Sequence, residues 1–163
     1  MSLIIRRMTV EDVQVAHEID RLSCTLPWPE RSFRFEVTDN PASRCWAAEL
    51  DGQVVGILIL WMIIDEAHIA TLATHPDHRR QGIAEQLLVT ALNKAYEEGA
   101  RSALLEVRAG NVAAQALYYK YGFEAVGSRK RYYKDNNEDA ILMTLKRLPG
   151  TLVSRVEKHN ETG

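Results

Sequence analysis

The sequence lacks the features that mark several large protein classes. Its 163 residues include only two cysteines, Cys24 and Cys45, which are too few for a disulfide framework and match neither a metal-binding nor a redox spacing. The longest apolar run, residues 54–64, is about half of the ~20 residues that a membrane-spanning helix needs. No basic lead with a cleavable apolar core precedes the first strand-like run. We therefore expect a cytoplasmic protein without a membrane partner.

An excess of positive charge is also missing. The chain has 20 lysines and arginines against 22 acidic residues, a formal net charge of −2. Without a global positive field we expect no direct nucleic-acid partner, and any anion would be bound locally. No repeat or low-complexity tract appears, and the 46% hydrophobic content suffices for one core. We expect one domain over residues 1–148, then a polar tail over 149–163 that is frayed or forms one weak helical turn, in a monomer or weak dimer.

The first half of the sequence predicts two helices followed by strands. Thr9 can cap a helix that carries apolar residues through position 22. Pro29 is expected in the first turn of a second helix that ends near Arg34. Asp51-Gly52 between two apolar runs predicts a tight hairpin turn. Strands are expected at residues 3–6, 45–50, 54–64 and 67–74.

The second half predicts two more helices between strands. Apolar residues recur at three- and four-residue steps over 82–98, and Gly99 then ends the pattern. Asn111 can cap a helix to about Tyr121. Strands are expected at 103–107, from Phe123, and at 140–145. This order predicts an α+β (α/β mixed) fold with a mixed sheet flanked by helices.

A polar loop leads into the helix at 82–98. It carries Arg79, Arg80 and Gly82, and Ala84 follows in the first turn. A helix N-terminus leaves N–H groups unpaired and carries partial positive charge, which suits a phosphate or pyrophosphate. The small side chains of Gly82 and Ala84 would let such a ligand approach the backbone. The alternative is a solvated basic loop before a helix.

These residues resemble a known family. Arg79-x-x-Gly82-x-Ala84 is similar to the acetyl-CoA signature Q/R-x-x-G-x-G/A of the GNAT N-acetyltransferase superfamily. Further stretches resemble its RimI-type branch, the ribosomal-protein-alanine N-acetyltransferases: residues 27–30, 65–67, 104–111, 116–118, 121–123, 131–133 and 138–140. The resemblance covers roughly residues 3–147. It implies the GNAT acyl-CoA N-acyltransferase fold, a central mixed, mostly antiparallel sheet flanked by about four helices.

The resemblance implies acetyl-CoA as co-substrate. In the family, the backbone at residues 72–74 pairs with pantetheine like an added strand, and residues 80–85 cradle the pyrophosphate. Asn111 also touches the cofactor, although simple helix capping is an equal alternative. The implied cofactor contacts are Leu72, Ala73, Thr74, Arg79, Arg80, Gln81, Gly82, Ile83, Ala84, Glu85 and Asn111.

Two side chains carry the expected chemistry. A free α-amino group has a pKa of about 7.7–8.0, so a weak base is enough to help deprotonate it. By resemblance, Glu106 accepts the amine proton, directly or through water; its alternative role is an ion pair with Arg108 or Arg101. Tyr118 is expected to protonate the departing thiolate, since a phenol can donate a proton without first being charged. Its alternative is ordinary packing on an aromatic-rich helix face.

The acceptor is expected to be a protein N-terminus. The resemblance implies acetylation of an α-amino group, with a ribosomal-protein alanine as the leading target. Leu26, Trp28, Glu30 and Tyr132 are expected to shape the peptide groove, although the two aromatic residues could equally be packing residues. Two alternatives stay open: an acetyltransferase of a lysine side chain or small-molecule amine, and a non-catalytic acyl-CoA-binding module.

Three histidines raise the question of a metal site. His68, His75 and His78 have no ligand spacing that fixes a geometry, and two arginines beside His78 disfavour a bound cation. We expect no metal.

Overall fold

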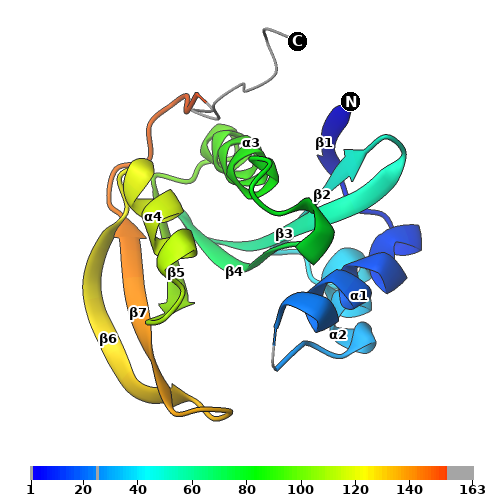
Figure 1. Ribbon diagram of the computed structural model, residues 1–163. Helices are drawn as coiled ribbons and strands as arrows, with labels where there is room; N and C mark the ends of the chain where they lie inside the picture. The colour runs from blue at the N-terminus through cyan, green and yellow to red at the C-terminus, as the bar shows by residue number, and fades with distance from the viewer. Residues whose placement is uncertain (1, 25, 154–163) are drawn as a thin grey trace, which may run out of the picture.

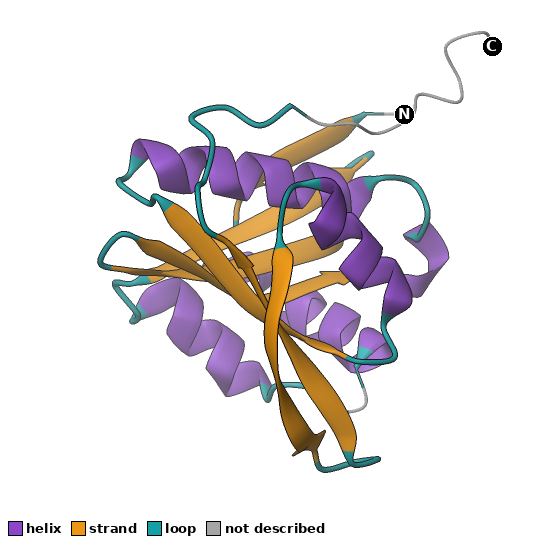
Figure 2. Ribbon diagram, turned by 90° about the vertical axis from the view of Figure 1, so that its left-hand side faces the viewer, coloured by secondary structure: helices purple, strands orange, loops and turns teal. Residues whose placement is uncertain are grey.

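The computed structural model describes residues 2–24 and 26–153. It contains a seven-stranded sheet with helices on both faces (Figures 1 and 2). Its strands are β1 (Leu3–Arg7), β2 (Ser43–Leu50), β3 (Gln53–Ile63), β4 (Glu66–Thr74), β5 (Ser102–Arg108), β6 (Glu124–Tyr133) and β7 (Glu138–Leu145). Its helices are α1 (Val13–Ser23), α2 (Glu30–Thr38), α3 (Ile83–Glu97) and α4 (Val112–Lys120), with 3-10 turns η1 (Val10–Asp12) and η2 (Pro76–His78). This order confirms the predicted α+β fold.

The strands lie in the order β1-β2-β3-β4-β5-β7-β6, and β4 and β5 run parallel while the other pairs are antiparallel. The β4–β5 ladder ends where Ile69 lies beside Leu105. Beyond that point β4 pairs only with β3, and β5 pairs only with β7. Residues 70–74 and 106–108 therefore border a gap that no ladder crosses in the described part of the chain. Backbone groups of β4 on this side are left for another partner.

Strand β3 shows how the sequence builds a core on each face. Its apolar run is buried on both sides, because successive side chains of a strand point to opposite faces. Leu58 and Leu60 pack in the cluster that contains residues of α3, whereas Ile57 and Ile59 pack in the cluster that contains residues of α1 and α2. The α3 side of this sandwich contains Leu87, Leu88 and Leu92, and the opposite side contains Val13, Ala16, Ile19 and Phe33.

Most predicted turns and caps are confirmed. Asp51 and Gly52 have φ values of 50° and 88°, as the β2–β3 hairpin turn requires. The Asn111 side chain accepts a hydrogen bond from the Ala114 N–H at 3.2 Å and so caps α4. Helix α2 differs from the prediction: Pro29 is its N-cap rather than a first-turn residue, and the helix continues to Thr38, four residues past the expected end.

An ion pair joins the first strand to the first helix. The Arg6 guanidinium donates to both carboxylate oxygens of Asp12, at 2.8 and 3.0 Å, and the Thr9 N–H donates to the same carboxylate at 2.8 Å. Asp12 is only 6% exposed. The hydrogen bonds from Arg6, and then that from Thr9, hold the pKa of Asp12 below its usual value despite the opposing effect of burial.

We therefore expect Asp12→Asn to lower the free energy of unfolding by about 1–3 kcal/mol at pH 7. Because the pKa of Asp12 is lower in the folded than in the unfolded chain (about 3.9), its stabilisation is complete above that value and is lost as the pH falls through the folded pKa. The difference between variant and wild type should shrink from pH 7 to pH 3 in urea unfolding. Glu18→Gln, on the exposed face of α1, serves as control; a pH-independent Asp12 effect would contradict the prediction.

The chain remains attached to the domain after residue 148. The Leu152 N–H donates to Asn93 Oδ1 at 2.6 Å, and the Asn93 amide donates back to the Leu152 carbonyl at 2.9 Å. The rest of the expected tail, residues 154–163, lies outside the described residues. No helix within residues 2–24 and 26–153 combines the length and apolar character that crossing a membrane demands.

Candidate active site

A cavity of about 480 Å³ opens where β4 and β5 separate. Its walls come from the loop between α1 and α2, the diverging strands, α4, and the turn between β6 and β7. Figure 1 shows the α1–α2 loop and the β6–β7 hairpin reaching beyond the sheet on either side of β4 and β5. Six residues predicted to bind or react line this one cavity: Leu26, Trp28, Leu72, Glu106, Asn111 and Tyr118.

Glu106 lies on β5 just beyond the last residue that pairs with β4. Its carboxylate forms an ion pair with Arg129 Nε of β6 at 3.2 Å, and its side chain is 31% exposed. The alternative partners expected from the sequence are wrong. Arg108 forms ion pairs with Asp135 and Glu138, and Arg101 donates to the carbonyls of Tyr96 and Ala100. The ion pair between exposed groups contributes little stability but holds the carboxylate at the cavity wall.

Tyr118 reaches the cavity from α4. The residue is only 6% exposed, and its ring packs against Phe123 with centroids 5.6 Å apart. Burial, together with nearby Tyr133, raises the pKa of Tyr118 to about 12. The phenol therefore keeps its proton at neutral pH and is available as a proton donor.

The α1–α2 loop is held by a buried carboxylate that sequence reasoning missed. Asp20, 3% exposed, accepts hydrogen bonds from the Trp28 N–H at 2.7 Å and from Cys24 Sγ at 3.3 Å. These contacts fix Trp28 at the cavity wall. The sequence did contain a clue: Asp20 lies four residues after Ala16 and next to Ile19, so it belongs to the apolar face of α1 and is expected to be buried.

The β6–β7 turn is tied to the end of β5. Arg108 stacks on the Tyr133 ring at 3.9 Å and forms ion pairs with Asp135 at 3.0 Å and Glu138 at 3.4 Å. Glu138 also accepts a hydrogen bond from the Gly110 N–H, and this bond, with those from Asn136 and Arg108, lowers the pKa of Glu138. The turn is thereby fixed beside the cavity.

The basic loop has the backbone that an anion site needs. Gly82, the N-cap of α3, has φ 76° and ψ 12°, and Arg80 has φ 64°, so both residues are in the left-handed region. The N–H groups at the start of α3 have no partner in the preceding turn of the helix. The α3 N-terminus packs closely on β3 at Gly56. A side chain at this position would place its Cβ only 2.9 Å from Ile83 Cγ2, so glycine permits the close approach.

Two orphaned polar atoms test whether this region fits acetyl-CoA. Within the described residues, Thr74 Oγ1 at the end of β4 and His78 Nδ1 before the basic loop are buried without a hydrogen-bond partner. Such atoms cost free energy unless a ligand or water satisfies them. They flank the unpaired part of β4 and the α3 N-terminus. A cofactor with an extended amide arm and a pyrophosphate has groups that suit both places.

Several predicted site residues do not line the cavity. Residues 79–82 form the adjoining loop and residues 83–85 the first turn of α3, where the Glu85 side chain turns away to Lys120, at 3.0 Å, and to the Tyr121 hydroxyl. Ala73 and Thr74 follow Leu72 along β4 without reaching the cavity wall. Glu85 can therefore offer a cofactor its backbone N–H rather than its carboxylate.

Two predicted acceptor-binding residues also lie outside the wall. Glu30 forms an i,i+4 ion pair with Arg34 at 3.9 Å. Tyr132 is 44% exposed and packs edge-on against Tyr133. It is Tyr133, not the predicted Tyr132, that lines the cavity.

The histidines that raised a metal reading do not converge. His68 Nε2 lies 3.2 Å from Glu66 Oε1, whereas the rings of His75 and His78 pack edge-on with their centroids 5.9 Å apart. Within the part of the chain that the structure describes, no cluster of three or more metal-ligating side chains occurs.

Comparisons with known proteins agree with this architecture. The model of the acetyltransferase (GNAT) family matches residues 13–123. A protein of Bacillus subtilis (strain 168), named provisionally as a ribosomal protein bS18-alanine N-acetyltransferase, is 40% identical over 139 residues, which are 85% of this chain and 92% of that protein.

Solved structures give the same answer. The crystal structure of the ribosomal-protein-S18-alanine N-acetyltransferase from Escherichia coli superposes with a TM-score of 0.83 at 29% identity, covering 96% of this chain and 99% of that one. A Bacillus anthracis str. Ames protein, named provisionally as a streptothricin acetyltransferase and solved with acetyl coenzyme A, has a TM-score of 0.72 at 26% identity, covering 88% and 98%. The resemblance and the enzyme class predicted from the sequence are confirmed. This chain belongs to the acetyltransferase (GNAT) family.

Proposed function

We propose that this protein transfers the acetyl group of acetyl-CoA to the α-amino group of a protein N-terminus, and that the N-terminal alanine of ribosomal protein bS18 is its acceptor. The observation that carries the proposal is the cavity between β4 and β5, which is lined by Glu106, Tyr118 and the α1–α2 loop together. The names of the Bacillus subtilis and Escherichia coli relatives support the choice of acceptor. A ribosomal acceptor also supports a cytoplasmic location.

The residues that would hold acetyl-CoA follow the gap and the loop. The backbone of residues 72–74 would pair with the extended arm, the N–H groups from Gly82 to Glu85 would bind the pyrophosphate, and Arg79 and Arg80 would add positive charge. Asn111, at the start of α4, lines the cavity and would contact the cofactor in addition to its capping role. When bound, acetyl-CoA supplies a thioester as acyl donor.

The chain's own groups would then move two protons. The Glu106 carboxylate would take a proton from the incoming amine, directly or through a water molecule. Tyr118 Oη would give its proton to the departing sulfur, since a phenol is fully protonated at neutral pH and can donate without first being charged. Arg129 would hold Glu106 in place through its ion pair.

A covalent route through cysteine is disfavoured. Cys24 lines the cavity as an exposed residue, but partial burial of its sulfur, and then the Asp20 carboxylate 3.3 Å from it, raise the pKa of its thiol to about 12. Only the thiolate is a strong nucleophile, and its fraction at neutral pH is very small. This supports direct attack of the amine on the thioester.

The test uses two peptides that begin with alanine and contain one lysine, one with a free and one with an acetylated α-amino group. We expect acetyl transfer from acetyl-CoA to the free terminus alone, measured by mass spectrometry. The blocked peptide is the control for side-chain acetylation, and equal labelling of both peptides would favour a lysine acetyltransferase. Binding of acetyl-CoA without transfer to either peptide would contradict the proposal and favour a small amine acceptor or a non-catalytic module.

A further inference from the structure

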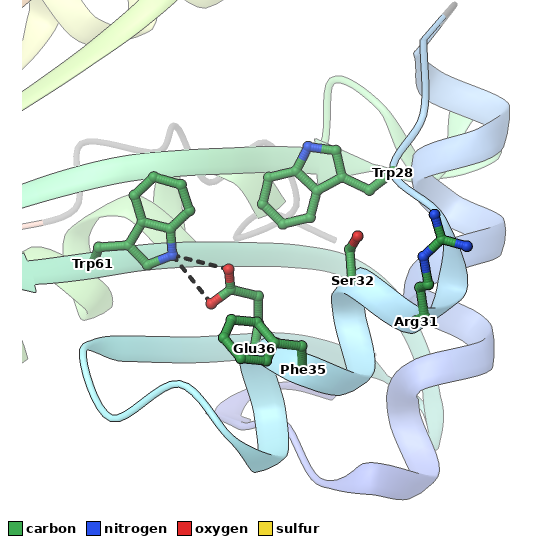
Figure 3. Close-up of a pocket in the computed structure, with 6 residues that line it drawn as sticks. All are labelled: Trp28, Arg31, Ser32, Phe35, Glu36 and Trp61. Carbon is green, nitrogen blue, oxygen red and sulfur yellow. Dashed lines mark hydrogen bonds between the residues drawn. The ribbon is translucent and has the colours of Figure 1, made fainter.

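A second hollow, of about 400 Å³, lies between α2 and β3 (Figure 3). It is lined by Trp28, Arg31, Ser32, Phe35, Glu36 and Trp61. Figure 3 shows the indoles of Trp28 and Trp61 on two sides of the Glu36 carboxylate, with Phe35 beside it. We call Trp28, Phe35, Glu36 and Trp61 the aromatic box. Phe35 is 50% exposed, so much of its side chain is open to solvent.

The carboxylate of the box is buried without a cation. Glu36 is 8% exposed, and it accepts hydrogen bonds from Trp61 Nε1, at 3.1 and 3.2 Å, and from the Asn40 amide at 2.7 Å. No lysine, arginine or histidine in the described residues forms an ion pair with it. Neutral donors offset only part of the cost of removing a charge from water. A cation that entered the hollow would complete the compensation.

The aromatic walls favour the same kind of ligand. The faces of indole and phenyl rings attract ammonium and guanidinium groups, most strongly where water is excluded. Arg31 does not fill this place, because Figure 3 shows its side chain pointing away from Glu36, on the far side of Ser32. The aromatic rings surround the Glu36 carboxylate and Arg31 points away from it, so the box could accept a basic side chain of another molecule.

The box adjoins the candidate active site through a shared residue. Trp28 lines both the box and the cavity that contains Glu106 and Tyr118. Its backbone is fixed by the hydrogen bond to Asp20. A peptide whose first residue lies in the cavity, and which leaves it on the side of Trp28, would reach the box with a later residue.

We propose that the aromatic box binds an arginine or lysine side chain of the acceptor, a few residues after its N-terminus, and so selects basic acceptor sequences. The inference rests on the proposed N-terminal acetylation and extends it to the acceptor's sequence. Glu36 would pair with the cation, while Trp28, Phe35 and Trp61 would contact its apolar stem and charged face.

The test compares peptides that begin with alanine and carry one arginine, or its neutral analogue citrulline, at each of the following few positions. We expect wild-type protein to bind the arginine peptide about tenfold or more tightly at one position, measured by calorimetry, with a matching difference in KM rather than kcat. Glu36→Gln should abolish this preference. Phe35→Leu, at a half-exposed position where folding is not at risk, should weaken it while keeping an apolar side chain.

Glu18→Gln provides the matched control, because it removes the same charge from an exposed ion pair on α1 that lines neither hollow. It should keep the full preference. Equal binding of the arginine and citrulline peptides at every position would overturn the proposal. So would a result in which Glu36→Gln and Phe35→Leu each weaken the binding of the arginine peptide and of the citrulline peptide by the same factor. Acetylation without an arginine preference would contradict the box alone, whereas an arginine preference without acetylation would contradict the proposed function.

Discussion

Tyr118→Phe is expected to lower kcat by about 100-fold or more while the affinity for acetyl-CoA stays nearly unchanged. Phenylalanine keeps the ring and its packing against Phe123 but removes the proton that the departing sulfur would receive. Rapid-mixing or steady-state assays with the free-terminus peptide give kcat, and calorimetry gives the dissociation constant of acetyl-CoA.

The next residue of the chain supplies the matched control. Tyr119 lies on the same helix but is 52% exposed and outside the cavity, so Tyr119→Phe should leave kcat near the wild-type value. An unchanged kcat in Tyr118→Phe would remove Tyr118 as the acid. A raised dissociation constant for acetyl-CoA with unchanged kcat would assign it a binding role instead.

Glu106→Gln is expected to reduce kcat/KM by about 100-fold, with the largest loss at low pH. An α-amino group has a pKa of about 7.7–8.0, so below that range most acceptor molecules are protonated and need a base. Above it the amine is already neutral and the carboxylate matters less. The measurement is kcat/KM for wild type and variant from pH 6 to pH 9.

Glutamine preserves the size of the side chain but loses the ion pair with Arg129. Glu124→Gln, an exposed position on β6 outside the cavity, controls for the change in charge. A loss that is equal at every pH would show that Glu106 positions the substrate rather than accepting its proton.

Local chemistry made most of the fold predictable. The Asn111 cap, the Asp51-Gly52 turn and the periodic apolar face of α3 each depend on residues a few positions apart, and each is confirmed. The end of α2 was placed too early, because after Arg34 the chain has no glycine or proline before Pro41 and the helix continues to Thr38.

The site was less predictable because it depends on register and strand order. A register shift between Arg129 and Tyr133, with Arg131 at φ 51°, breaks the alternation of β6, so a period of two cannot tell which of Tyr132 and Tyr133 faces the cavity. The ion pair between Glu106 and Arg129 spans β7, which lies between β5 and β6, and no local pattern reveals that order. The aromatic box likewise combines α2 with a distant residue of β3.

The separation of β4 from β5 also bears on aggregation. Unpaired strand edges usually invite other chains to add a strand, and proteins protect their outer edges against this. Here the unpaired backbone of residues 70–74 lies inside the sheet, with β5 on the other side of the gap and the α1–α2 loop and α4 in the surrounding cavity wall. An inner edge flanked in this way is less open to a second sheet than the outer edges at β1 and β6. If residues 72–74 pair with the arm of acetyl-CoA as proposed, the hydrogen-bonding edge offered to that ligand is one that fibril growth does not readily use.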